Sequence, residues 1–96
     1  MAWTLQNIMR LPGERPGVYV YFDDKGRALY AGHGSERGVK ARLIDAWYRR
    51  GDYRTDAVKK EMREKIAKVD IIWGNNIYDN YALEAKLKKE CLYNVR

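Results

Sequence analysis

Two short runs of β-branched and aromatic residues, separated by a polar turn, dominate the first third of the chain. The run 18–22 is Val-Tyr-Val-Tyr-Phe, and the run 28–32 follows it after Asp-Asp-Lys-Gly at 23–26. Such runs favour strands, and the intervening residues suit a type I turn with Gly26 in the left-handed region. The pattern predicts an antiparallel hairpin, preceded by one helical turn that Thr4 caps.

The spacing of the apolar residues changes after the glycine-rich stretch 33–38, which is predicted to be a loop. Val39, Leu43 and Trp47 recur at every fourth position, which is typical of one face of a helix. This spacing predicts a helix that ends near Gly51.

Two further helices and a third strand are predicted downstream. Apolar residues three or four positions apart predict a helix over 56–68, and the apolar run 69–74 predicts a strand. Asp79 or Asn80 is a suitable cap for a last helix that runs to about Cys91. The order β-β-α-α-β-α predicts an α+β fold, in which helices flank a three-stranded antiparallel sheet.

Alternation along the hairpin places Tyr19, Tyr30 and Gly32 on one face and the aliphatic residues on the other. A phenol can donate, accept or lose a proton, and glycine lets a backbone or a phosphate approach closely. Taken singly, each tyrosine is explained more simply as a residue that fits a half-buried pleat.

The composition indicates one globular domain spanning residues 1–96, with 46% hydrophobic residues. The net charge of +6 and the pI of about 9.5 favour a polyanionic partner, and a merely basic surface is the alternative. One cysteine and one histidine exclude a disulfide framework and a zinc cluster. No apolar run reaches the roughly 18 residues of a membrane span, and no signal peptide is seen. We therefore expect no membrane partner and a reducing, cytoplasmic location.

Several short motifs, in a fixed order, resemble those of the GIY-YIG nuclease family. Among its members the chain is most similar to the N-terminal incision domain of the bacterial excinuclease C. The matching residues are Leu11-Pro12, Pro16-Gly17-Val18-Tyr19, Leu29-Tyr30-Ala31-Gly32, Arg42-Leu43, Ala82-Leu83-Glu84 and Tyr93-Asn94. Each motif is weak alone, and their order over residues 11–94 carries the resemblance.

The resemblance implies a metal-dependent endonuclease that hydrolyses DNA phosphodiester bonds. Tyr19 would be the general base for the attacking water, aided by Tyr30, and Arg42 would clamp the phosphate. Glu84 would hold one Mg²⁺ or Mn²⁺ ion, and Asn94 would orient part of the site. The candidate DNA-binding residues are Gly32, His33, Lys40, Tyr48, Arg49 and Arg50.

The chain departs from the family at three positions near this site. The family often has a histidine or tyrosine one helical turn after the arginine, where this chain has Ala46; either Tyr48 substitutes for it or the role is lost. His33 stands where relatives often have lysine, and it either contacts phosphate or assists proton transfer, or is a loop residue without a role. The loop 34–38 is about two residues longer than in the nearest relatives, and Lys88 replaces a frequent isoleucine.

Two alternative functions remain open at this point. The first is a nucleic-acid-binding module of the same fold without catalysis, which Ala46 favours. The second is a protein-interaction domain, for instance an inhibitor that mimics a nuclease. The basic helix 56–68 is either a phosphate-tracking stripe or a solvated face interrupted by Glu61 and Glu64. DNA is the expected partner, with RNA as the alternative. The chain is either a standalone nuclease, a fragment of a larger enzyme with a specificity domain, or one that works with a partner protein; the oligomeric state and the biological role stay open.

Overall fold

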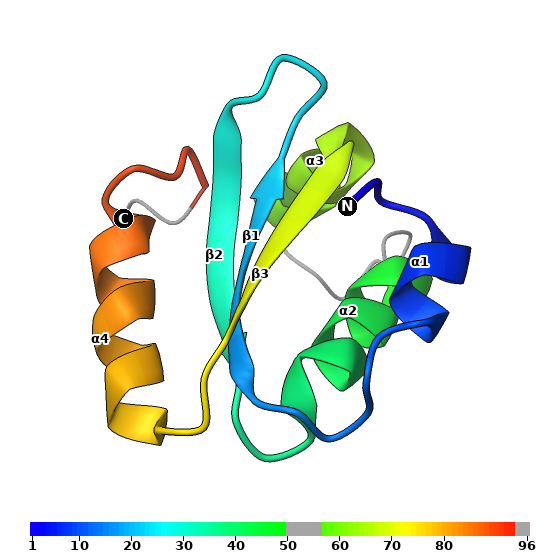
Figure 1. Cartoon of the computed structure of the whole chain (residues 1–96). Helices are drawn as coiled ribbons and strands as arrows, with labels where there is room; N and C mark the ends of the chain where they lie inside the picture. Colours follow the sequence, from blue (N-terminus) through cyan, green and yellow to red (C-terminus); the bar gives the residue numbers. More distant parts are fainter. Residues whose placement is uncertain (50–56, 94–96) are drawn as a thin grey trace.

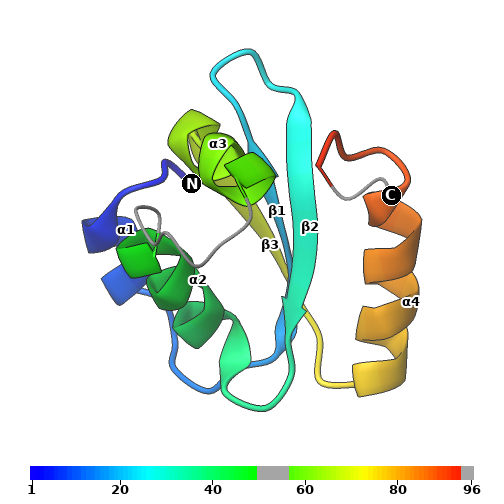
Figure 2. The same ribbon diagram turned by 180° about the vertical axis from the view of Figure 1, so that it is seen from behind.

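The computed structural model describes residues 1–49 and 57–93, and its sheet has three antiparallel strands in the order β2-β1-β3. The elements in chain order are α1 (Leu5–Met9), β1 (Gly17–Phe22), β2 (Ala28–Gly34), α2 (Gly38–Arg49), α3 (Ala57–Lys65), β3 (Lys68–Trp73) and α4 (Ile77–Lys88). The first three helices lie on one side of the sheet, and α4 lies alone on the other, beside β2 (Figure 1 and Figure 2). The predicted fold class is confirmed.

The larger core forms on the tyrosine face of the sheet. The two-residue alternation is confirmed, since Tyr19 and Tyr21 share this face with Val69 of the neighbouring strand. Both tyrosines are buried under α1, α2 and α3, which contribute Ile8 and Leu43 among others. This face is therefore a packed core as well as the place where the predicted phenols meet.

A smaller core forms on the opposite face, under α4. Val20 and Ala31 of the central and edge strands pack with Cys91 and Leu87. Along α4 the side chains buried most fully are polar, namely Asn80 and Glu84. The Asn80 amide donates to the Gly74 carbonyl over 2.8 Å, which joins the start of α4 to the end of β3.

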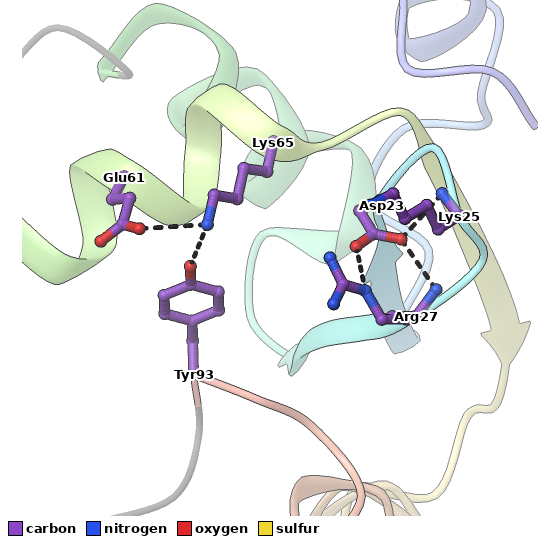
Figure 3. Close-up of polar contacts among 6 residues, drawn as sticks. All are labelled: Asp23, Lys25, Arg27, Glu61, Lys65 and Tyr93. Carbon is purple, nitrogen blue, oxygen red and sulfur yellow. Dashed lines mark hydrogen bonds and ion pairs between the residues drawn. The ribbon is translucent and has the colours of Figure 1, made fainter.

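The hairpin turn is held by one buried carboxylate (Figure 3). Asp23 accepts the backbone N–H groups of Lys25 and Arg27 at 3.0 and 2.8 Å, and the Arg27 Nε at 2.7 Å. Gly26 has a φ of 79°, as the predicted turn requires. The pairing shifts by one residue between Tyr21 and Phe22, so Leu29 joins the larger core.

Four predicted boundaries, in three elements, were wrong. β2 continues to Gly34, so His33 lies in a strand because it pairs with Val18. The basic helix ends at Lys65, because Lys68 begins β3. The cap of α4 is Asn76, which accepts from the N–H groups of Tyr78 and Asp79, and the helix ends at Lys88 rather than near Cys91. Thr4 caps α1 as predicted.

The segment after α4 returns to the edge strand. The Leu92 and Tyr93 N–H groups donate to the carbonyls of Ala28 and Leu29 at 3.1 and 2.9 Å. The Tyr93 hydroxyl accepts from Lys65 at 3.1 Å, which connects this segment to α3 (Figure 3). Among the helices that the structure describes, none is both long and apolar enough for a membrane span.

Replacing Asn76 by alanine should lower the free energy of unfolding by about 1 kcal/mol, because two N–H groups of α4 lose their acceptor. Asn75→Ala is the matched control, and we expect it to change the value by less than about 0.5 kcal/mol. Urea denaturation measures both variants. Equal effects at the two positions would show that the cap does not stabilise α4.

Candidate active site

A half-enclosed hollow of about 200 Å³ lies between the tyrosine face of the sheet and the helices α2 and α3. It brings together three of the predicted residues, two phenols and one guanidinium. The lining residues are Tyr19, Tyr21 and Tyr30 from the sheet, Arg42, Asp45 and Ala46 from α2, and Met62 and Arg63 from α3. The sheet thus supplies hydroxyl groups, and the helices supply charge.

Gly32 determines where the Tyr19 phenol lies. The two residues are direct partners in the antiparallel pair of β1 and β2. A Cβ atom built at Gly32 would lie 2.5 Å from the Tyr19 hydroxyl oxygen, too close for any real contact. Only glycine at this position leaves room for the ring, so the predicted close approach is made by the phenol of the same hairpin.

Burial raises the pKa of Tyr19 well above its ordinary value. The neighbouring phenol of Tyr30 raises it further, and the charges of Arg42 and Arg63 lower it by a smaller amount. Tyr19 therefore keeps its proton at neutral pH in the free protein. Arg42 and Arg63 supply the positive charge that a basic phenol needs, but their effect on the pKa of Tyr19 is smaller than the effect of burial.

Glu84 lies on the other side of β2, on the inward face of α4. It is only 8% exposed. One carboxylate oxygen pairs with the His33 Nδ1, and the other lies 2.6 Å from the Lys88 ammonium. The His33 ring packs edge-on against Tyr81, with the ring centres 4.4 Å apart. His33 is thus held by a carboxylate and an aromatic ring.

Burial lowers the pKa of His33, and the charges of Arg42 and Lys88 lower it further. The His33 Nδ1–H donates to the Glu84 carboxylate, which can only accept. The charge of Arg42 lowers the pKa of both Tyr19 and His33.

The chemistry of Glu84 fits a hard divalent cation. Such a cation takes oxygen ligands and often binds through one carboxylate, with waters and substrate oxygens completing the shell. Within the described residues no group of three or more His, Cys, Asp or Glu side chains converges, and Glu84 is the predicted metal ligand. Its nearly buried carboxylate already attracts a cation, because the Lys88 ammonium lies against it.

The remaining predicted residues lie elsewhere. Tyr48 is 69% exposed and is not among the residues that line the hollow, whereas Ala46 is. The Lys40 ammonium donates to the Met9 carbonyl over 2.9 Å and so ties α2 to α1. The side chain of Arg49, and all of Arg50 and Asn94, lie outside the described residues.

Tyr21, Asp45 and Arg63 line the hollow although none of them was predicted to belong to the site. Each carried a signal in the sequence. Tyr21 shares the face of Tyr19 by alternation, and Asp45 lies three residues after Arg42 on one helix. Arg63 lies on the basic helix 56–68, for which a phosphate-tracking stripe was one interpretation, but its place in the hollow depends on how α3 packs over the sheet.

Comparison with known proteins agrees with this geometry. The model of the UvrC-like GIY-YIG domain matches residues 15–95. A crystal structure of the GIY-YIG N-terminal endonuclease domain of UvrC from Thermotoga maritima, a point mutant with its catalytic divalent cation, is 28% identical, with a TM-score of 0.70 over 97% of this chain and 100% of that chain. The structure of that domain with magnesium is 23% identical, with a TM-score of 0.68 over 95% and 97%. No curated protein matches the chain.

The fold and the site together define a nuclease domain of the GIY-YIG class. The chain belongs to the family of UvrC-like GIY-YIG domains. The resemblance carried by its short motifs is therefore confirmed over most of its length.

The stability of the protein should fall as the pH rises above about 10, the ordinary pKa of tyrosine. Unfolded chains lose phenolic protons there, whereas burial raises the pKa of Tyr19 and Tyr21 and keeps both neutral in the fold. Urea denaturation across this pH range measures the slope. The double variant Tyr19→Phe/Tyr21→Phe should flatten it, and Tyr78→Phe, at a side chain 81% exposed, should not. A slope unchanged in the double variant would contradict this account.

Proposed function

We propose that this domain is a metal-dependent endonuclease that hydrolyses phosphodiester bonds of DNA. The observation that carries the proposal is the convergence of Tyr19, Tyr30 and Arg42 on one hollow. The charge of the same arginine also acts on His33, which pairs with Glu84. The T. maritima domain is an endonuclease bound to a catalytic divalent cation, magnesium in one structure. The net charge of +6 suits a polyanionic substrate.

Each residue then has a chemical role. Arg42 binds the phosphate through paired hydrogen bonds from its planar guanidinium. A Mg²⁺ or Mn²⁺ ion held by Glu84 would neutralise charge on the phosphate and assist the leaving oxygen. His33 donates to Glu84 and so orients the carboxylate.

Proton transfer must respect the raised pKa of Tyr19. A neutral phenol serves as a base if it passes its own proton on while it accepts one. We assign Tyr19 to accept the proton of the attacking water and to pass its own to the neighbouring Tyr30. Tyr30 is only half-buried, so its proton can reach solvent.

The remaining assignments complete the proposed interface. Asn94 follows Tyr93, whose N–H bonds to the edge strand, and is proposed to orient part of the site. The proposed contacts to DNA are made by Gly32, His33, Lys40, Tyr48, Arg49 and Arg50. We propose a role in DNA repair inside the cell, in which a further domain or a partner protein selects the substrate.

A binding module without catalysis is the second candidate. It is favoured by Ala46, which lines the hollow where the family often has a histidine or tyrosine. Such a module would bind DNA in a salt-dependent way without cutting it.

Cleavage of a supercoiled plasmid and of branched and single-stranded DNAs separates the two functions. We expect cutting with Mg²⁺ or Mn²⁺, none with chelator, and a loss of about 100-fold or more in Tyr19→Phe. Glu84→Gln should abolish cutting, and Glu64→Gln, at an exposed position on α3, should not. Cutting that survives Glu84→Gln would refute the assigned metal ligand. Salt-sensitive binding without cutting on any DNA would favour the module.

Replacing Lys88 by methionine should tighten binding of Mn²⁺ by up to about tenfold, because the ammonium 2.6 Å from Glu84 competes with the ion. Isothermal titration calorimetry without DNA measures this directly. Lys86→Met removes an exposed charge from the same helix and is the matched control. Unchanged or weaker binding in Lys88→Met alone would show that the lysine does not compete.

A further inference from the structure

One wall of the hollow has no part in the proposed chemistry. Tyr19, Tyr30 and Arg42 account for the sheet and for α2, whereas Tyr21 and Arg63 also line the same space. Both side chains are polar, and they come from different elements, β1 and α3.

Burying the Tyr21 hydroxyl costs free energy of folding, and the group has no evident role in the fold. The side chain is 2% exposed, and its oxygen has no hydrogen-bond partner among the residues that the structure describes. A buried hydroxyl left without a partner costs about 1–3 kcal/mol, and phenylalanine would fill the same space without that cost. The ring is fixed between Trp3, Tyr19 and Tyr30, with centre distances of 5.1, 5.3 and 6.1 Å. A buried hydroxyl without a partner in the protein is suited to hydrogen-bond a bound ligand.

Arg63 brings a second guanidinium to the hollow. It comes from α3, whereas Arg42 comes from α2, so the two charges reach the space from different helices. Its charge acts on both Tyr19 and Tyr21, where it opposes the effect of burial on the pKa. Asp45 is the one carboxylate among the lining residues, and the two arginines outnumber it.

The small side chain of Ala46 leaves this space open. The occupant that suits it is an anion with several oxygen acceptors, because the walls offer phenolic donors and two planar guanidinium groups. A phosphate group of a nucleic acid has this chemistry, and arginine binds it through paired hydrogen bonds.

We propose that Arg63 and Tyr21 form a second wall of the phosphate site and bind the phosphate that Arg42 holds, from the side of α3. This inference rests on the proposed nuclease function and adds two substrate-contacting residues to it. Tyr21 donates its hydroxyl proton as a hydrogen bond to a phosphate oxygen, and Arg63 supplies charge that Arg42 alone does not provide.

The test compares Tyr21→Phe, Arg63→Gln and Arg63→Lys with the wild type. Affinity for a fluorescein-labelled DNA duplex is measured by anisotropy in chelator, cleavage is measured with Mg²⁺, and stability is measured by thermal unfolding. We expect Arg63→Gln to bind roughly tenfold more weakly, with Arg63→Lys only partly restored because an ammonium cannot form the paired contact. Tyr21→Phe should be as stable as the wild type or more so, yet should bind and cut less well. Lys25→Gln, at an exposed position in the hairpin turn, controls for net charge.

The outcomes separate this inference from the nuclease function. If Glu84→Gln stops cleavage while Tyr21→Phe and Arg63→Gln bind and cut like Lys25→Gln, the nuclease stands and the second wall is refuted. If the wild type cuts no DNA, the proposed function fails, and the binding comparison in chelator still tests the wall. A clear loss of stability in Tyr21→Phe would show that the hydroxyl serves the fold, and would overturn its assignment.

Discussion

The contact of the Tyr19 phenol with Gly32 is the constraint on which the rest of the site depends. The pair sits at the centre of the β1–β2 ladder, and no side chain fits at Gly32 while the phenol is there. The same register sets Tyr21 opposite Tyr30 and so builds the floor of the hollow. A slip of one residue would turn the tyrosines of β1 toward α4 and remove them from Arg42.

The tyrosine face stabilises the fold, and the proposed chemistry would use the same side chains. Its rings form the larger core with α1, α2 and α3, and burial gives Tyr19 a raised pKa. A well-packed phenol is a poor base in isolation, so its usefulness depends on neighbours that can accept or stabilise a proton. The structure provides them as Tyr30 on the same sheet and Arg42 on the adjacent helix.

Local patterns predicted the helices and strands well, because these elements depend on the spacing of apolar and polar residues along the chain. The hairpin, its Gly26 turn and α2 all follow from alternation or helical periodicity, whereas Arg42 was selected through the resemblance to the family. The inward face of α4 could not be predicted in this way, because Asn80 and Glu84 are polar and form no apolar stripe. The pairing of Glu84 with His33 and the position of Arg63 in the hollow depend on tertiary packing, which no local pattern predicts.

In the connection between β2 and α2, the length of the loop does not determine where the helix lies. A side chain at Gly34 would collide with the backbone of Gly38, and the Val39 N–H bonds to the Arg15 carbonyl at 3.0 Å. The two ends of the loop are thus held in place, and the residues Glu36 and Arg37 between them are exposed. Since each doubling of loop length costs only about 0.6 kcal/mol, this loop is a place where a recognition segment can be inserted without moving α2.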